Sequence, residues 1–93
     1  MTITQLKYVL AVAEYKNFTL AAEKCFVTQP TLSMQIQKIE EELSINIFDR
    51  TKKPIQLTDL GRKIVEQAKN IVNEADRMQD IVEQQKGFIG GEF

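Results

Sequence analysis

Apolar residues recur at helical spacing near the beginning of the chain. Between residues 3 and 15 they return every three or four positions, which predicts an amphipathic helix. Thr2 and Gln5 have the spacing of a capping box at the start of that helix. A second, shorter helix is predicted over residues 20–25, with the Thr19 hydroxyl as its N-cap. The pattern therefore predicts two consecutive helices.

A third and more polar helix is predicted to begin after Thr28. The Thr28 hydroxyl suits an N-cap, and Pro30 fits the first turn because its missing N–H is not needed there. Residues 25–27, between the two helices, are expected to form a buried connector. A short helix, a tight turn and a longer polar-faced helix predict a helix-turn-helix. Its apolar stripe has spacings of four, three and four and consists of Leu32, Ile36, Ile39 and Leu43.

Strand-like alternation replaces the helical period after Leu43. Ser44 stands where a helix-ending glycine would be expected. Apolar and polar residues then alternate over residues 45–50 and 55–57, with a turn over residues 51–54. These short strands predict a hairpin with a basic tip, the wing of a winged helix. Two strands are marginally stable alone, so the hairpin must lean on the helices.

A long amphipathic helix is predicted over residues 59–86, with Thr58 as its cap. At 1.5 Å per residue it would be roughly 40 Å long, which is too long for so small a core to cover. The apolar seam repeats every seven residues, which favours a coiled coil with a second chain. The alternative is packing against its own domain, which we expect only the first two turns to reach. The seam consists of Ile64, Ala68, Ile71, Ala75, Met78 and Val82.

The last segment, residues 87–93, contains three glycines, and we expect them to end the long helix. Its phenylalanines and isoleucine have no obvious partner in so short a tail. We therefore interpret the segment as the start of a hinge to a C-terminal domain. The predicted organisation is a mainly α-helical fold. It has a winged helix-turn-helix over residues 1–58, a linker helix over residues 59–86 and the hinge over residues 87–93.

Composition excludes several classes of protein. The chain has 93 residues, 43% of them hydrophobic and 27% charged, which fits one globular domain. It has no apolar stretch long enough for a membrane span and no signal-peptide pattern, so we expect a cytoplasmic protein without membrane contact. A single cysteine, Cys25, excludes an internal disulfide, and the lack of histidine argues against a zinc site.

Charge and acidic residues bear on function in opposite ways. The net charge of −1 argues mildly against nucleic acid, so any attraction to DNA must come from a local basic patch. The acidic run Glu40 to Glu42 does not predict a catalytic site, because consecutive residues point around a helix and no nucleophile converges on them. We expect neither enzyme activity nor a cofactor in this region.

The polar face of the third helix carries groups suited to DNA. It has hydroxyls, amides and one cation, with no acid before Glu40. Amides and hydroxyls can hydrogen-bond base edges, and the free backbone amides of a helix start suit a phosphate. The alternative is an ordinary amphipathic helix with a solvated face. The candidate groove residues are Gln29, Pro30, Thr31, Ser33, Met34 and Gln35, and the candidate backbone-contacting residues are Thr28, Lys38, Arg50, Lys52 and Lys53.

Several motifs together give the chain a specific resemblance. They are Ala21-Ala22-Glu23-Lys24, Val27-Thr28-Gln29-Pro30-Thr31-Leu32-Ser33, Ile36-Gln37-Lys38-Ile39-Glu40, Leu43, Phe48-Asp49-Arg50, Leu57-Thr58 and Gly61. The combination resembles the N-terminal DNA-binding region of LysR-type transcriptional regulators, from about Thr2 to Gln85 without a gap. The stretch from Thr28 to Ser33 is similar to that of peroxide-responsive members, and other members share it.

The resemblance implies a winged helix-turn-helix, a dimer formed through the linker helix, and a C-terminal domain that senses a ligand or a redox signal. It leaves a tetramer open for a full-length protein, and it does not identify the effector. It implies that a DNA-contacting helix begins at Gln29, Pro30, Thr31 and Ser33, and that Arg50 and Lys53 contact the DNA backbone.

The chain departs from the family pattern at three positions. Cys25 stands where leucine is usual, and Ser44 stands where glycine is usual. Met34 stands where a polar or basic side chain is frequent, which weakens the implied base readout at that position. Cys25 would lie on the inner side of the short second helix, so we expect a buried and inert thiol rather than a redox sensor.

Two functions from different classes remain open. The first is a sequence-specific transcription regulator that binds an interrupted inverted repeat as a dimer. The second is a winged-helix protein-interaction module that does not bind DNA. The near-zero net charge favours the second. The Gln29–Ser33 stretch and the basic wing favour the first.

Overall fold

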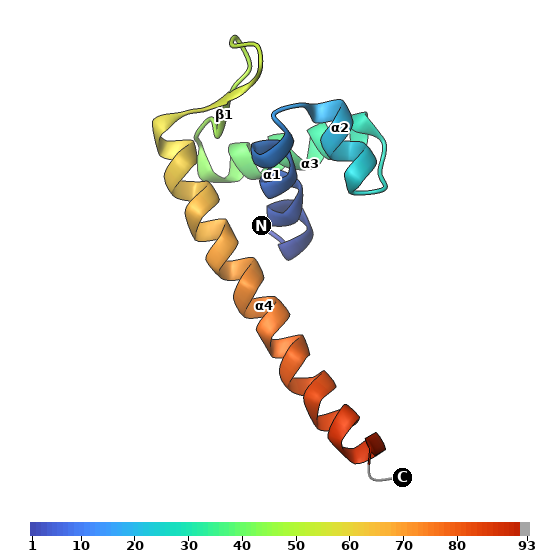
Figure 1. Cartoon of the computed structure of the whole chain (residues 1–93). Helices are drawn as coiled ribbons and strands as arrows, with labels where there is room; N and C mark the ends of the chain where they lie inside the picture. The colour runs from blue at the N-terminus through green and yellow to red at the C-terminus, as the bar shows by residue number, and fades with distance from the viewer. Residues whose placement is uncertain (92–93) are drawn as a thin grey trace.

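The fold is mainly α-helical with a two-stranded wing, as the sequence predicts. The computed structural model describes residues 1–91, and the side chains of residues 1–86. Three helices, a hairpin and the first half of the fourth helix form a head, and the rest of the fourth helix projects from it (Figure 1). The elements are α1 (Ile3–Tyr15), α2 (Phe18–Lys24), α3 (Gln29–Leu43), β1 (Phe48–Asp49), β2 (Gln56–Leu57) and α4 (Asp59–Gly91). None of the described helices is long and apolar enough to cross a membrane.

The caps of α1 agree with the sequence, whereas the start of α2 does not. The Gln5 backbone amide donates to the Thr2 hydroxyl, and the Thr2 backbone amide donates to the side-chain oxygen of Gln5, both at 3.0 Å. The prediction that Thr19 caps a helix beginning at residue 20 is wrong. Asn17 is the cap, because its side-chain oxygen accepts from the Leu20 amide at 2.9 Å. This earlier start brings Phe18 into α2, where its ring meets the Phe48 ring edge-on.

The α3 helix begins and ends where its side chains predict. Thr28 is the N-cap, and Ser44 is the C-cap with a φ of 57°, so a serine adopts the left-handed conformation that glycine usually supplies. Leu32, Ile36 and Ile39 are fully buried. The opposite face of α3 is left outside the core, which makes it available for contacts.

The turn before α3 differs from its prediction as a buried connector. Phe26 is 94% exposed, with a φ of 59°. The Phe26 amide donates to the Glu23 carbonyl and the Val27 amide to the Ala22 carbonyl, so the turn folds back onto α2. Residue 26 therefore lies on its outer side, while Cys25 and Val27 are half-buried and pack against the core.

The wing is an antiparallel pair that aligns Phe48 with Leu57 and Asp49 with Gln56. Its strands are shorter than the alternating pattern predicts. The Ile47 and Phe48 amides donate to the Glu40 carboxylate instead of extending the ladder. The segment between β1 and β2 extends from the head as a long loop (Figure 1).

The first half of α4 belongs to the core. Val65, Ala68 and Val72 are buried, and α4 packs along α1. The prediction that only two turns of the long helix reach its own domain is therefore wrong. Burial extends over roughly four turns because α1 lies alongside and supplies an apolar face.

A close backbone approach fixes the start of α4. The Thr58 hydroxyl accepts from the Gly61 amide at 2.9 Å, as expected of a cap, and donates to the Asn46 carbonyl at 2.6 Å. A Cβ atom on Gly61 would lie only 2.1 Å from the Ile47 carbonyl oxygen. Glycine is therefore required here for α4 to pack against the segment that leads into the wing.

The predicted end of the linker helix at residue 86 is wrong, because α4 continues to Gly91. Glycine lowers helix stability by only about 1 kcal/mol, and it keeps the N–H that the helical hydrogen bonds need. A helix-breaking effect would require proline, which this segment lacks. The rest of the predicted hinge, residues 92–93, lies outside the described residues.

Candidate nucleic-acid interface

The start of α3 presents a set of polar side chains that are already oriented. The Thr28 hydroxyl accepts from the Thr31 amide at 3.3 Å and donates to the Thr31 hydroxyl at 2.8 Å. One turn of helix links the next pair, since the Gln29 side-chain amide donates to the Ser33 hydroxyl at 2.6 Å. The side-chain oxygen of Gln29 and the hydroxyl hydrogen of Ser33 remain available to a partner.

The outer face of α3 continues from this start and lies opposite the apolar stripe. Pro30 and Met34 are exposed there, as predicted, and so is Lys38. Gln37 is exposed on the same side of the helix and was not among the predicted site residues. Its spacing of three from Met34 and four from Ser33 is the signal that could have found it.

Gln35 lies toward α1 rather than at the centre of the outer face. It is half-buried, and its side-chain oxygen accepts from the Gln5 side chain at 2.9 Å. Its own NH₂ group keeps two donors. The structure thus brings together Gln35 and Gln5, and the sequence indicated only the capping role of Gln5.

The acids of α3 are divided between three environments. Glu40 is buried, Glu41 is exposed, and the Glu42 carboxylate pairs with the N-terminal ammonium at 2.6 Å. All three lie in the last turns of α3. The first half of the helix is therefore the part that a polyanion can approach without repulsion.

The wing provides the cations, and they have different surroundings. Lys52 and Lys53 are exposed in the loop between β1 and β2. The Arg50 guanidinium is bonded to the Glu40 carboxylate and lies 5.1 Å from the centroid of the Phe18 ring. At the base of the loop, hydrogen bonds from the Thr51 hydroxyl and backbone amide lower the pKa of the Asp49 carboxyl, so this acid stays charged to a lower pH than an ordinary aspartate.

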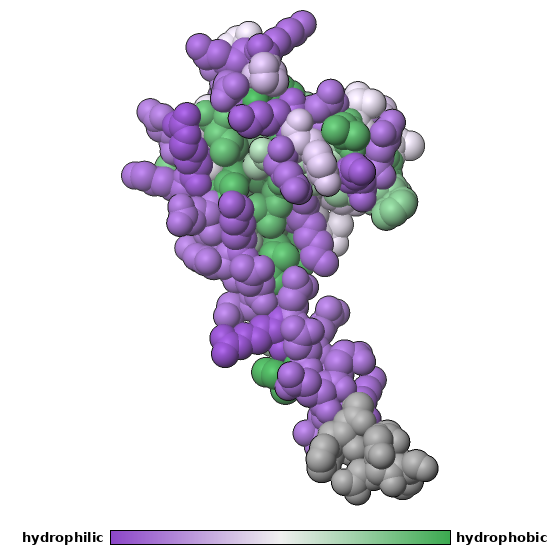
Figure 2. Space-filling view, viewed as in Figure 1, coloured by the Kyte–Doolittle hydropathy of each residue, from purple (hydrophilic) through white to green (hydrophobic). Residues whose placement is uncertain are grey.

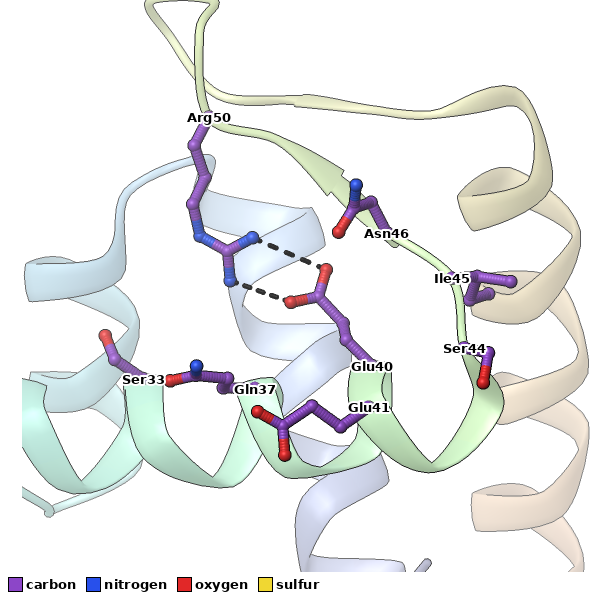
Figure 3. Close-up of a pocket in the computed structure, with 8 residues that line it drawn as sticks. All are labelled: Ser33, Gln37, Glu40, Glu41, Ser44, Ile45, Asn46 and Arg50. Atoms are coloured by element: carbon purple, nitrogen blue, oxygen red, sulfur yellow. Dashed lines mark hydrogen bonds and ion pairs between the residues drawn. The ribbon is translucent and has the colours of Figure 1, made fainter.

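A hollow of about 660 Å³ separates the outer face of α3 from the wing. Figure 3 shows Ser33 and Gln37 on the helix below it and Arg50 reaching down from the wing above. Polar side chains from both elements therefore face one space. The lining residues are Ser33, Gln37, Glu40, Glu41, Ser44, Ile45, Asn46 and Arg50.

The predicted seam of α4 is divided by the fold. Ala68 is buried within its own head, and Ile64, Ile71 and Ala75 are half-buried. Met78 and Val82 are exposed, together with Ile81, which was not predicted as a seam residue. Figure 2 shows apolar side chains gathered in the head and a mostly polar surface on the projecting helix.

Cys25 is half-buried rather than fully buried. Burial raises the pKa of its thiol, which lowers the fraction of reactive thiolate at neutral pH. Its placement against the core therefore favours the predicted inert role.

Comparison with known proteins agrees with this geometry. Residues 3–62 match the family described as "Bacterial regulatory helix-turn-helix protein, lysR family". The chain is 38% identical over 91 residues to the hydrogen peroxide-inducible genes activator of Pectobacterium carotovorum subsp. carotovorum. The aligned region covers 98% of this chain and 30% of that protein. It therefore spans less than a third of the length of this curated relative.

Solved structures give the same result. The DNA-binding domain of BenM in complex with benA site 1 DNA superposes with a TM-score of 0.87 at 35% identity, covering 92% of this chain and 97% of that one. A full-length OxyR from Pseudomonas aeruginosa superposes with a TM-score of 0.86 at 39% identity, covering 90% of this chain and 28% of that one. The family match covers most of the described chain, so this protein belongs to the LysR family of bacterial regulatory helix-turn-helix proteins.

Proposed function

We propose that this chain is the sequence-specific DNA-binding region of a transcription regulator. In this proposal α3 lies in the major groove and the wing lies along the sugar–phosphate backbone. The observation that carries the proposal is the start of α3. There Thr28, Gln29, Thr31 and Ser33 are fixed by mutual hydrogen bonds, on the acid-free half of the helix. Side chains held in this way lose little entropy when they contact base edges.

Local charge supports the proposal despite the net charge of −1. Lys38 lies on the outer face of α3, and Lys52 and Lys53 lie in the exposed loop of the wing. Of the nearby acids, Glu40 is paired with Arg50 and Glu42 with the N-terminal ammonium, so Glu41 and Asp49 are the acids that oppose these three lysines. The patch that faces a duplex is therefore more basic than the chain as a whole, and phosphate contacts depend on such local charge.

The relatives support the same proposal. DNA-binding domains of BenM and CbnR have been solved in complexes with DNA, and both superpose on most of this chain. Their sequence identity to this chain is 35% in each case. For this chain, the position of α3 in a groove and the backbone contacts of Arg50, Lys52 and Lys53 are part of the proposal.

A dimer formed through α4 completes the proposal. The projecting half of α4 exposes Met78, Ile81 and Val82 on a surface that its own head does not cover. A second copy of the helix would bury them, and twofold dimers are the commonest homo-oligomers. Two copies of α3 would then reach two half-sites, so the operator should be an interrupted inverted repeat.

The setting of this activity is proposed on the same basis. As a family of regulators, LysR proteins act on genes, so we place this chain in the cytoplasm and assign it no enzyme activity or cofactor of its own. An effector would bind another part of a longer protein. The alternative, an interaction module without DNA binding, rests on the net charge alone.

Selection of bound sequences from a random duplex pool tests the proposal. We expect one enriched motif with inverted half-sites, whose binding weakens steeply as salt rises. Gln29→Ala or Ser33→Ala should weaken binding to that motif by about 1–3 kcal/mol if a base contact is lost. Gln67→Ala, on the exposed side of α4, is the matched control and should bind like the parent. No enrichment would favour the interaction module. Parent-like binding of the selected motif by both α3 variants would instead remove Gln29 and Ser33 from the base contacts.

A further inference from the structure

Glu40 is the one charged residue that is buried among the residues whose side chains the structure describes, at 6% exposure. Its carboxylate joins α3 to the wing. One oxygen, Oε2, accepts from the Ile47 amide at 2.8 Å, the Phe48 amide at 3.3 Å and Arg50 Nη1 at 3.4 Å. The other oxygen, Oε1, accepts from Arg50 Nη2 at 3.0 Å. A single side chain of α3 therefore holds both the backbone of β1 and the first cation of the wing.

Arg50 is held on two sides. Both terminal nitrogens of its guanidinium are bonded to Glu40 (Figure 3), and the group lies over the Phe18 ring at 5.1 Å. The side chain nevertheless remains 44% exposed. A guanidinium has five N–H donors in a rigid plane, and Glu40 takes two of them. The orientation of the remaining three is therefore set by the pair.

We infer that Glu40 is a positioning residue for DNA binding, which fixes Arg50 and the base of the wing so that the free N–H groups of Arg50 meet a backbone phosphate. This inference rests on the proposed function and adds the residue that orients the wing. Ser33 and Gln37 line the same hollow from α3, so a phosphate that enters it would meet donors from both elements.

Simple electrostatics gives the opposite expectation, which makes the inference testable. A carboxylate beside a bound phosphate repels it, so its neutralisation should strengthen binding. If Glu40 only stabilised the fold, its substitution would lower the unfolding temperature and leave the affinity of the folded protein for DNA unchanged. Weaker DNA binding after the loss of this negative charge is expected only if Glu40 positions Arg50 or the wing as a whole.

The experiment compares Glu40→Gln with Glu41→Gln in the 93-residue chain. Both variants remove one acid from the same hollow, but Glu41 is exposed, and its carboxylate has no hydrogen-bond partner within residues 1–86. Affinity for the selected duplex is measured over a range of salt, well below the unfolding temperature of each variant. We expect Glu41→Gln to bind as tightly as the parent or more tightly. We expect Glu40→Gln to bind several-fold more weakly. The slope of its log affinity against log salt concentration should fall by about one, as expected for the loss of one phosphate contact.

A double variant separates positioning from a general effect on the wing. In an Arg50→Met background there is no guanidinium to orient, so adding Glu40→Gln should cause no further loss. An equal loss in both backgrounds, or parent-like binding by Glu40→Gln, would overturn the inference. A parent chain that binds no duplex would instead contradict the proposed function itself.

Arg50→Lys keeps the inference falsifiable if Glu40→Gln does not fold. Lysine keeps the positive charge, but a single ammonium cannot span both carboxylate oxygens and also present a fixed fork to a phosphate. We therefore expect several-fold weaker binding with circular dichroism like that of the parent. Parent-like affinity of Arg50→Lys would show that the fixed guanidinium is not needed, and would overturn the inference.

Discussion

The two halves of α4 have the same secondary structure but different support. In the head, Val65, Ala68 and Val72 are buried against the rest of the chain. In the projecting half, Met78 is 68% exposed and Val82 is 47% exposed. Tertiary packing supplies most of the stability of a helix in a protein. The first half of α4 therefore has its partner within this chain, whereas the second half exposes an apolar strip that suits a partner outside it.

Charge pairs do not replace that missing packing. The projecting half has an ion pair between Arg77 and Glu74 at 3.4 Å, with both side chains largely exposed. Such pairs contribute little, since solvent screens them and two long side chains must be ordered. The head instead buries its only internal acid, Glu40, with every buried side-chain polar atom among the described residues hydrogen-bonded. The contrast predicts that substitutions in the two regions will have different consequences.

The largest difference should come from matched truncations. Leu32→Ala removes a fully buried side chain from the head and should lower the free energy of unfolding by about 2–5 kcal/mol. Ile81→Ala removes an exposed side chain from the projecting helix and should change it by less than about 0.5 kcal/mol in dilute solution. Urea denaturation at low protein concentration measures both. Similar losses would mean that the projecting half is packed against something within one chain.

Local chemistry explains what the sequence could predict. Thr2, Thr28 and Thr58 begin three helices as expected, because a cap involves only neighbouring residues. The apolar stripe of α3 was also predictable, since one helix determines its own faces. The start of α2 was mispredicted at Thr19. Asn17 caps the helix instead, and the packing of Phe18 against Phe48 favours this earlier start.

Contacts between distant residues explain what the sequence could not predict. The partner of Gln35 is Gln5 on another helix, and nothing in the spacing of either residue links them. In the acidic run, Glu40 follows Ile36 by four positions, so it lies at the edge of the apolar stripe. That spacing suggests burial, but its partners, Ile47, Phe48 and Arg50, become evident only when the wing is placed.

A smaller effect is expected where the supported half of α4 begins. Gly61→Ala should lower the free energy of unfolding by about 1–3 kcal/mol, because the new Cβ would lie within 2.1 Å of the Ile47 carbonyl oxygen. Helix propensity alone would favour alanine by about 1 kcal/mol, so the sign of the change is informative. Lys63→Ala, exposed two residues later, is the control and should be close to neutral. Thermal unfolding followed by circular dichroism compares the two, and a stabilised Gly61→Ala would show that α4 can shift away.

A charge introduced into the projecting half of α4 should weaken dimer association and leave the stability of the folded monomer almost unchanged. Val82→Asp places a carboxylate on the exposed strip, where a dimer would have to bury it, so the dimer should weaken at least about tenfold. Val82 is chosen instead of Ile71 because Ile71 also packs against the head, so its substitution would affect folding as well as association. Gln84→Asp adds the same charge on a different side of the helix and is the control.

Light scattering at matched concentrations distinguishes the outcomes of this substitution. We expect a dimeric parent, a dimeric Gln84→Asp variant and a largely monomeric Val82→Asp variant. At concentrations low enough for all three proteins to be monomeric, their unfolding temperatures should be nearly equal. A parent that is monomeric, or a Val82→Asp variant that stays dimeric, would place the dimer interface elsewhere.

The smallest expected effect concerns the cations of the two regions. Lys53 is exposed in the wing loop of the head, and Lys86 is exposed near the far end of α4. If only the head meets the duplex, Lys53→Ala should weaken binding to all sequences about equally and lower the slope of log affinity against log salt by about one. Lys86→Ala should then leave that slope unchanged, because its charge would lie farther from the DNA backbone than the screening length of about 10 Å. Titrations of selected and unrelated duplexes at several salt concentrations measure both slopes. A changed slope for Lys86→Ala would extend the DNA-contacting surface along α4, and an unchanged slope for Lys53→Ala would remove the wing loop from it.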